Sequence, residues 1–244
     1  MLSIPILYED DRIIVINKPA GLVVTPGVGL SFEESLAGWA RRYVGDSILK
    51  VGQQDRWGIV HRLDKDTTGV MVIAKTITGY EQLKEQFRER RVEKSYLAMV
   101  WGVPEESEFV IDAPINRNPK NWRRFVVMEG GKMARTRFRL LEERVEVEGL
   151  DYEFSLLECC PVTGRTHQIR VHLAALGFPI VGDRLYSGRK KYRYVKRVIE
   201  RPFLHARRLG FFLPSGNGGV WREFVASLPS DLKRLLSSDL VCKL

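Results

Sequence analysis

Cysteine is scarce in this chain, and its few cysteines form no recognisable motif. Cys159 and Cys160 are neighbours and Cys242 stands near the end, so the sequence holds no C-x-x-C pair. This usage argues against a disulfide scaffold and a cysteine-ligated zinc site, and it is typical of the reducing cytosol. We therefore expect a cytoplasmic protein.

Long apolar runs, an export signal and internal repeats are also missing. No stretch approaches the roughly 18 consecutive apolar residues that a membrane helix needs, so we expect no membrane partner. The first residues, MLSIPILYEDDR, soon turn acidic and lack the basic start and cleavage site of a signal peptide. Because no composition shift or low-complexity linker interrupts the chain, the sequence predicts a single domain over residues 1–244, with two lobes around one cleft.

Positive charge is what the chain has in excess. Its 39 lysines and arginines outnumber 30 aspartates and glutamates, which leaves a net charge of +9 at pH 7. A balance of this size favours a polyanionic partner, nucleic acid first, with a merely basic surface as the alternative. Apolar residues make up 44% of the chain, which is enough to bury a core.

The hydrophobic pattern mixes many short strands with few helices. Predicted strands cover residues 4–8, 12–17, 70–75, 94–102, 109–112, 135–141, 152–159 and 203–213. Predicted helices cover residues 31–43, 78–91, 165–176 and 229–240, the first opened by a capping box of Ser31 and Glu34. Because the strands do not alternate regularly with helices, we expect an α+β fold with a largely antiparallel sheet.

The stretch HRLDKDTTG (61–69) places charged and polar residues just before a buried strand. Four of its residues match the opening positions of an EF-hand calcium loop, but Lys75 stands where that loop needs a glutamate. A zinc site on His61 lacks a second histidine at helical spacing. A polar turn capped by Asp64 explains Asp66 well, but it does not explain why histidine, arginine and aspartate crowd together.

Three further stretches carry basic residues. TGRTHQIRVH (163–172) stands at a predicted helix start, where it forms an anion site or a solvated basic face. RNPKNWRRF (117–125) interleaves arginines with aromatics, which suits phosphates and exposed bases, and RKKYRYVKRVIER (189–201) repeats that composition. The alternative for the last two is a flexible charged loop. We expect Trp122, Arg123 and Arg124 to bind RNA.

Six blocks of the chain closely resemble the RluA-type pseudouridine synthases, and they follow the order of that family. The blocks are NKPAGLVVTPG (17–27), HRLDKDTTG (61–69), EKSYLAMVWG (93–102), TGRTHQIRVH (163–172), GFPIVGDRLY (177–186) and FLHARRLGF (203–211). The resemblance implies the pseudouridine synthase fold, a mixed, mainly antiparallel bent sheet with flanking helices and a central basic cleft. It also implies isomerisation of uridine to pseudouridine in RNA, without a metal or an organic cofactor.

The resemblance also implies the roles of three residues. The family's catalytic aspartate falls on Asp64, its active-site tyrosine on Tyr96 and the basic partner of the aspartate on Arg165. Asp64 acts as a nucleophile at C1′ or as a base that begins glycal formation, and both routes stay open. Burial would raise the pKa of Asp64, whereas a guanidinium beside it would oppose that rise and orient the carboxylate. Tyr96 offers a flat face for the uracil.

Other residues are expected around the flipped uridine. Ile169 and Leu204 are expected to form apolar walls of the base pocket. A uridine must leave its helix or loop to react, which costs a few kcal/mol. Arg62 is expected to fill the resulting gap or grip a neighbouring phosphate. His61 either frames the RNA or serves as a structural histidine.

The resemblance indicates the class of RNA substrate less directly than it indicates the reaction. HRLDKDTTG and the 112–141 stretch resemble most the family branch that acts on large-subunit ribosomal RNA, so we expect ribosomal RNA first and transfer RNA next. Many members of that branch carry an N-terminal S4-type domain, which we do not expect here. A monomer is expected. The alternatives are an RNA-binding ribosome-assembly factor with incidental catalysis and, disfavoured by the missing ligand set, a metal-dependent nuclease.

Overall fold

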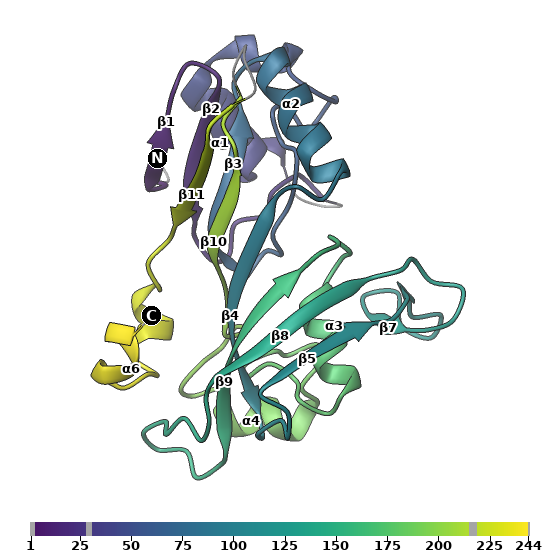
Figure 1. The fold of residues 1–244 in the computed structure, drawn as a ribbon, viewed down its shortest axis with the longest axis vertical. Coiled ribbons are helices and arrows are strands. Elements are labelled where there is room, and N and C mark those ends of the chain that lie inside the picture. Colours follow the sequence, from purple (N-terminus) through teal and green to yellow (C-terminus); the bar gives the residue numbers. More distant parts are fainter. Residues whose placement is uncertain (1–2, 28–30, 215–218, 244) are drawn as a thin grey trace. The chain divides into compact units, whose positions relative to one another are not determined.

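The computed structural model describes residues 3–27, 31–214 and 219–243 (Figure 1). The chain divides into two compact units. The first comprises Met1–Lys94 and Ala206–Ser227, and the second comprises Ser95–His205 and Leu228–Leu244. The chain passes from one unit to the other three times: within β4 (Glu93–Trp101), within β10 (Leu204–Phe212) and after Ser227.

The first unit is built on a mainly antiparallel sheet. Its strands are β1 (Ile6–Glu9), β2 (Ile13–Lys18), β3 (Thr68–Ala74), the later part of β10, and β11 (Trp221–Val225). Ile14 of β2 pairs with Ile73 of β3, and Leu209 of β10 pairs with Phe224 of β11. All seven residues of β3 are buried, because side chains on both faces of this central strand are covered. These pairings confirm the strands predicted over 4–8, 12–17 and 70–75.

The helices of the first unit begin at side-chain caps. α1 spans Leu36–Val44 and α2 spans Ile77–Arg88, and 3-10 turns cover Phe32–Glu34 and Asp46–Lys50. The predicted helix start at Ser31 is wrong. Ser31 and Glu34 do pair, at 3.0 Å between Oγ and Oε2, but they cap only the 3-10 turn. The α-helix starts after Ser35, whose Oγ accepts the Gly38 N–H at 3.2 Å and redirects the chain.

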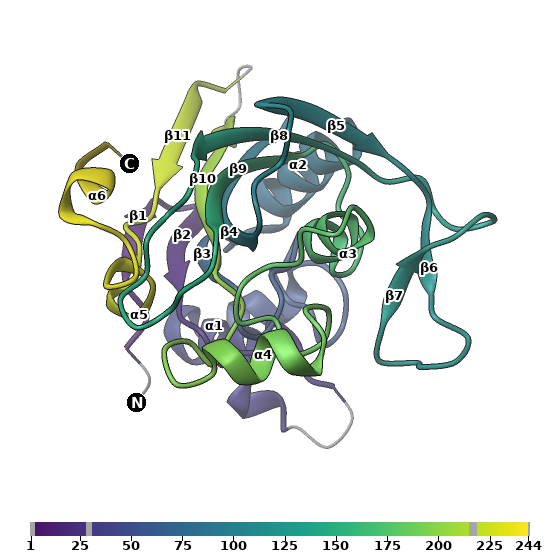
Figure 2. The same ribbon diagram turned by 90° about the horizontal axis from the view of Figure 1, so that it is seen from below.

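The second unit contains a curved antiparallel sheet. The strands lie in the order β4, β9 (Phe154–Pro161), β8 (Arg135–Glu142) and β5 (Glu108–Asp112). A separate hairpin is formed by β6 (Ile115–Arg117) and β7 (Phe125–Val127). The helices are α3 (Gln168–Ala175), α4 (Arg189–Val195), α5 (Ser230–Lys233) and α6 (Ser238–Lys243). Figure 2 shows β9, β8 and β5 arching over α3.

Two predicted helices of this unit differ from the structure. The helix predicted over 165–176 starts at Gln168, because the backbone of His167 takes a left-handed conformation (φ 56°) just before it. Arg165 therefore lies in a turn and not on the helix. The helix predicted over 229–240 is two short helices, α5 and α6, with a break between them.

The α+β class with a mainly antiparallel sheet and flanking helices is confirmed. Among the residues that the structure describes, no helix combines the length and the apolar character needed to cross a membrane. The central basic cleft stays a prediction.

Candidate active site

The turn that carries Asp64 leads directly into the central strand of the first unit. Ile59 forms a bridge to Ile73 of β3, and the chain then loops back to enter β3 at Thr68. Asp64 is half-buried, and its carbonyl oxygen accepts the Thr67 N–H at 3.2 Å. The predicted polar turn before the strand is thus present.

A buried lysine holds this turn from behind. Lys18 is 0% exposed, at the end of β2. Its Nζ donates to the carbonyl oxygens of Pro19, Leu22 and Lys65, at 2.8, 2.8 and 2.9 Å. The last bond fixes the backbone one residue after Asp64. This role of Lys18 was not predicted from the sequence, although a lysine at the end of the apolar run IIVIN was a signal.

Gly69 closes the turn at a place where only glycine fits. Its φ is +121°, in the region that disfavours side chains, and it lies against Ala206 of β10. A Cβ at this position would lie less than 3.0 Å from three backbone atoms of Ala206. The final glycine of HRLDKDTTG therefore allows β3 to approach β10.

His61 is held as a neutral structural ring. Its Nε2 accepts the Val72 N–H at 3.1 Å, and the ring stacks on Phe87 with centroids 4.7 Å apart. Burial, together with the charge of Lys94, lowers the pKa of His61 to about 3. The pKa of Lys94 is itself lowered to about 8, by burial and by the charge of Arg90. A neutral His61 orients the turn but brings no charge to a phosphate; its contact with RNA stays a prediction.

The neighbouring Arg62 is exposed. Of the ion pairs in the described part of the chain, none involves it. The guanidinium is thus available for RNA, as its predicted role requires.

Tyr96 stands at the start of the second unit, on a well-anchored strand. It lies opposite Cys159 in the β4–β9 register, and the preceding Ser95 donates its hydroxyl to Glu158 at 2.7 Å. The half-buried Tyr96 packs against the core cluster that also contains Ile169 and Leu204. The three residues thus share one core cluster of the second unit, and their role around a uracil stays a prediction.

A buried glutamine shapes the turn that carries Arg165. The Oε1 atom of Gln168 accepts the Arg165 N–H at 2.9 Å and the Thr163 hydroxyl at 2.7 Å. Its Nε2 donates to the Thr136 hydroxyl and to the Arg135 carbonyl, at 2.9 and 3.0 Å. All four hydrogen-bonding positions of this amide are used, which makes the turn rigid.

The side chain of Arg165 is also restrained. Its Nε donates to the Met133 carbonyl at 3.0 Å, and this bond fixes the orientation of the guanidinium. Asp64 belongs to the first unit and Arg165 to the second. The predicted pairing of their side chains therefore stays a prediction.

The hairpin formed by β6 and β7 is tied to the start of α3. The Phe125 N–H donates to the Tyr186 hydroxyl at 2.9 Å, and that hydroxyl lies 2.9 Å from Nδ1 of His167. Arg124 lies over the Tyr186 ring, 5.3 Å from its centroid. Tyr186 thus connects the basic hairpin with the residues that follow Arg165. No role for Tyr186 was predicted from the sequence.

The tip of this hairpin presents an aromatic ring beside a cation. Trp122 is 68% exposed, and the Arg123 guanidinium lies 5.4 Å from its ring centroid. Arg117 holds the loop by donating to the Trp122 carbonyl at 2.6 Å. An exposed ring and nearby guanidiniums suit the predicted RNA contact of Trp122, Arg123 and Arg124, which stays a prediction.

The metal sites considered from the sequence find no support. Within residues 3–27, 31–214 and 219–243, no three His, Cys, Asp or Glu side chains come together as a metal-binding group.

Comparisons with known proteins agree with the resemblance. The family described as RNA pseudouridylate synthase matches residues 12–175. An "Uncharacterized RNA pseudouridine synthase" of Chloroflexus aurantiacus is 44% identical over 220 residues, covering 90% of this chain and 64% of the relative. A "Ribosomal large subunit pseudouridine synthase D" of Nitrosomonas europaea is 40% identical over 241 residues, covering 97% and 65%. The chain thus spans slightly less than two thirds of the length of these relatives.

A solved structure shows the same fold. "Human RNA Pseudouridylate Synthase Domain Containing 1" superposes with a TM-score of 0.73 at 26% identity, covering 99% of this chain and 94% of that one. The family match includes the positions of Asp64, Tyr96 and Arg165. This chain belongs to the RNA pseudouridylate synthase family.

Proposed function

We propose that this protein isomerises specific uridines of structured RNA to pseudouridine, with large-subunit ribosomal RNA as its first substrate and transfer RNA as the next. The match of the family over residues 12–175 carries the proposal. The name of the Nitrosomonas europaea relative supports the ribosomal choice. The proposed enzyme is a cytoplasmic monomer that needs no cofactor.

The reaction breaks the bond between C1′ and N1, turns the uracil and joins C1′ to C5. The proton leaves C5 and N1 gains one, so nothing is oxidised and nothing is hydrolysed. Asp64 attacks C1′ or removes a sugar proton, and either step needs a carboxylate at a fixed position. The bond from Lys18 to the carbonyl of the next residue provides that rigidity.

The second unit supplies the groups that hold the loosened base. Tyr96, Ile169 and Leu204 offer a ring and apolar walls from one cluster. Arg165, on a turn fixed by Gln168, is the residue we propose as the basic partner of Asp64, because a planar guanidinium can orient a carboxylate with two hydrogen bonds. Arg62 takes the place of the extruded uridine in the RNA.

Release of tritium from ribosomal RNA labelled at C5 of uridine tests the proposal. We expect Asp64→Asn to lose turnover while it retains RNA binding. Asp66→Asn is the matched control, because it removes an exposed carboxylate from the same turn and should leave turnover within about twofold. Turnover of Asp64→Asn near that of the wild type would overturn the assignment.

The substrate and the alternative role need separate measurements. We expect faster release from large-subunit ribosomal RNA than from transfer RNA, and the reverse order would transfer the proposal to transfer RNA. If Asp64→Asn complemented a deletion strain, the assembly role with incidental catalysis would be favoured. Arg165→Lys should lower turnover at least about tenfold, because a lysine loses the two-pronged contact.

A further inference from the structure

α4 and the turn after it form the most basic segment of the second unit. Residues 189–197 read RKKYRYVKR and hold six lysines and arginines but no acid. The functional site described above uses none of them. Because like charges so close together repel one another, a role for them is expected.

One side of this helix is fixed against the core. Val195 is fully buried, and Ile199 follows it in the same cluster. Lys191 turns inward, with its Nζ 5.2 Å from the ring centroid of Trp101, and burial lowers the pKa of this lysine. Tyr194 is anchored by its hydroxyl, which accepts the Asp151 N–H at 2.7 Å. These contacts leave α4 a single orientation.

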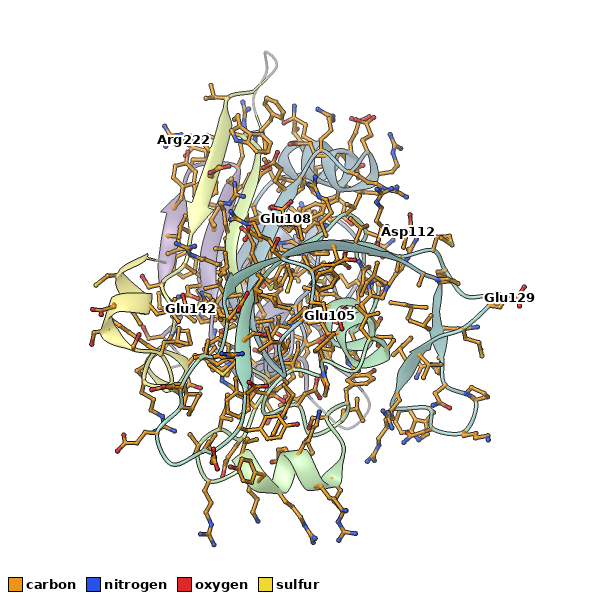
Figure 3. The ribbon with its side chains drawn as sticks, turned by 60° about the horizontal axis from the view of Figure 1, so that its bottom comes forward. Glu105, Glu108, Asp112, Glu129, Glu142 and Arg222 are labelled. Atoms are coloured by element: carbon orange, nitrogen blue, oxygen red, sulfur yellow. The ribbon has the colours of Figure 1, made fainter. Side chains whose placement is uncertain are left out.

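The remaining cations point outward on one side. At ~100° per residue they fall within an arc of about 120°. They are Arg189, Lys190, Arg193, Lys196 and Arg197, which together we call the α4 face, and all five are exposed. Figure 3 shows long nitrogen-tipped side chains that extend from α4 at the bottom of the view.

Within the part of the chain that the structure describes, no acidic side chain neutralises the α4 face. None of the ion pairs among the described residues involves its five cations. Nearby Arg201 is paired with Asp231 at 2.6 Å, and on α2 Lys84 and Arg88 each have a glutamate partner three residues away. The α4 face is therefore a concentrated, uncompensated positive charge on a rigid support, which favours a polyanion.

The composition of the α4 face indicates which form of RNA it suits. Its arc contains no aromatic side chain for stacking on unpaired bases. The nearest exposed ring, Tyr194, is held by Asp151 and packs 6.0 Å from Trp101. Phosphates are the groups such a face can bind, and in paired RNA they are the accessible groups. By contrast, the exposed Trp122 of the hairpin suits unpaired bases.

We propose that the α4 face binds the phosphate backbone of double-stranded RNA, as a contact separate from the residues that handle the reacting uridine. The inference deepens the proposed function and rests on it for the choice of RNA as the polyanion. It predicts that substrates with a base-paired segment bind more tightly than the same length of single strand.

Binding of a labelled RNA hairpin of about 16 base pairs, measured by fluorescence anisotropy over a salt series, tests the inference. The variant Arg189→Gln/Arg193→Gln/Arg197→Gln removes three cations from the face. We expect its affinity to fall at least about tenfold at low salt, and the slope of log K against log salt to fall by about 2 to 3 units. The variant Arg189→Lys/Arg193→Lys/Arg197→Lys should keep the slope of the wild type.

The matched control is Lys84→Gln/Arg88→Gln/Arg91→Gln, which removes the same charge from cations paired with glutamates. Its slope should stay within about one unit of the wild type. An unchanged slope in the α4 variant would overturn the inference, as would an equal loss in the control. A loss of binding to phosphatidylglycerol vesicles without a loss of hairpin binding would overturn it too.

The assay keeps this inference apart from the proposed function, because it measures binding and not turnover. Asp64→Asn should bind the hairpin with the slope of the wild type. Suppose that the wild type formed no pseudouridine but the salt slope of the triple Arg→Gln variant still fell. The RNA contact of the α4 face would then be supported, and the proposed enzymatic function would not.

Discussion

The ammonium group of Lys18 donates a hydrogen bond of 2.9 Å to the carbonyl of Lys65, the residue that follows Asp64. The two residues lie 47 positions apart in the chain. The bond joins the end of β2 to the turn before β3. It therefore couples the stability of the first unit to the position of the proposed catalytic carboxylate.

Lys18→Met should destabilise the protein by about 2–4 kcal/mol, because buried carbonyl groups lose their donor. Urea unfolding measures the change. Lys65→Met is the matched control, since only the backbone of Lys65 takes the bond and its side chain is exposed. The control should change the free energy of unfolding by less than about 0.5 kcal/mol. Equal losses in the two variants would contradict the bond's role.

Gly69→Ala should destabilise the protein by more than the strain of placing an alanine at a positive φ. Gly21→Ala isolates that effect, because Gly21 also has a positive φ (+79°) but has nothing within 4 Å of an added Cβ. We expect about 1 kcal/mol for Gly21→Ala and at least twice that for Gly69→Ala, which adds a clash with Ala206. Thermal or urea unfolding of both variants measures the difference, and equal costs would show that β3 and β10 separate without penalty.

Acid should weaken the fold through His61. Its pKa is about 3 when folded and about 6.5 when unfolded, so the unfolded chain binds more protons in that window. The free energy of unfolding should therefore fall as the pH drops from about 6.5 toward 3, by about 2–3 kcal/mol at pH 4.5 from this residue alone.

Urea unfolding of the wild type and of His61→Gln, at pH 7.5 and at pH 4.5, measures the contribution of His61. Glutamine keeps an acceptor for the Val72 N–H but does not titrate. His172, whose pKa burial also lowers, is present in both proteins and cancels. The acid loss should be smaller in the variant, and equal losses in both proteins would show that His61 is not buried as a neutral ring.

Tyr186→Phe should loosen the basic hairpin. It leaves the Phe125 N–H and Nδ1 of His167 without their shared partner, which costs about 1–3 kcal/mol. Amide hydrogen exchange at Phe125 should become faster. Tyr194→Phe is the control, because its hydroxyl makes two comparable bonds to Asp151 at an exposed site. It should cost less than about 1 kcal/mol, and an unchanged Phe125 exchange rate in Tyr186→Phe would contradict the link.

Predictions of secondary structure from the local sequence were confirmed where a segment had one clear hydrophobic pattern. The apolar runs at 12–17 and 70–75 became β2 and β3, because short runs rich in β-branched residues favour a buried strand. The turn that carries Asp64 was also predicted. The predicted starts of two helices were wrong. At Ser35 a side chain caps the helix later than predicted, and at His167 the backbone leaves the helical conformation. No helix was predicted over 189–201, which was interpreted as a nucleic-acid-binding stretch with a flexible charged loop as the alternative. The structure forms α4 there, and its many cations leave too few apolar residues for a helical pattern to be visible in the sequence.

Short blocks of sequence were enough to recognise the family of this protein. They were also enough to recognise the residue types that the chemistry needs, because the functional groups of aspartate, tyrosine and arginine are properties of the side chains themselves. The supports of those residues could not. Lys18, Gln168 and Tyr186 act on groups 47, 33 and 61 positions away, and no local pattern shows that a hydrogen bond will close over such distances. Tertiary packing alone placed these groups in contact, because a buried polar atom takes whichever partner the folded chain brings within reach.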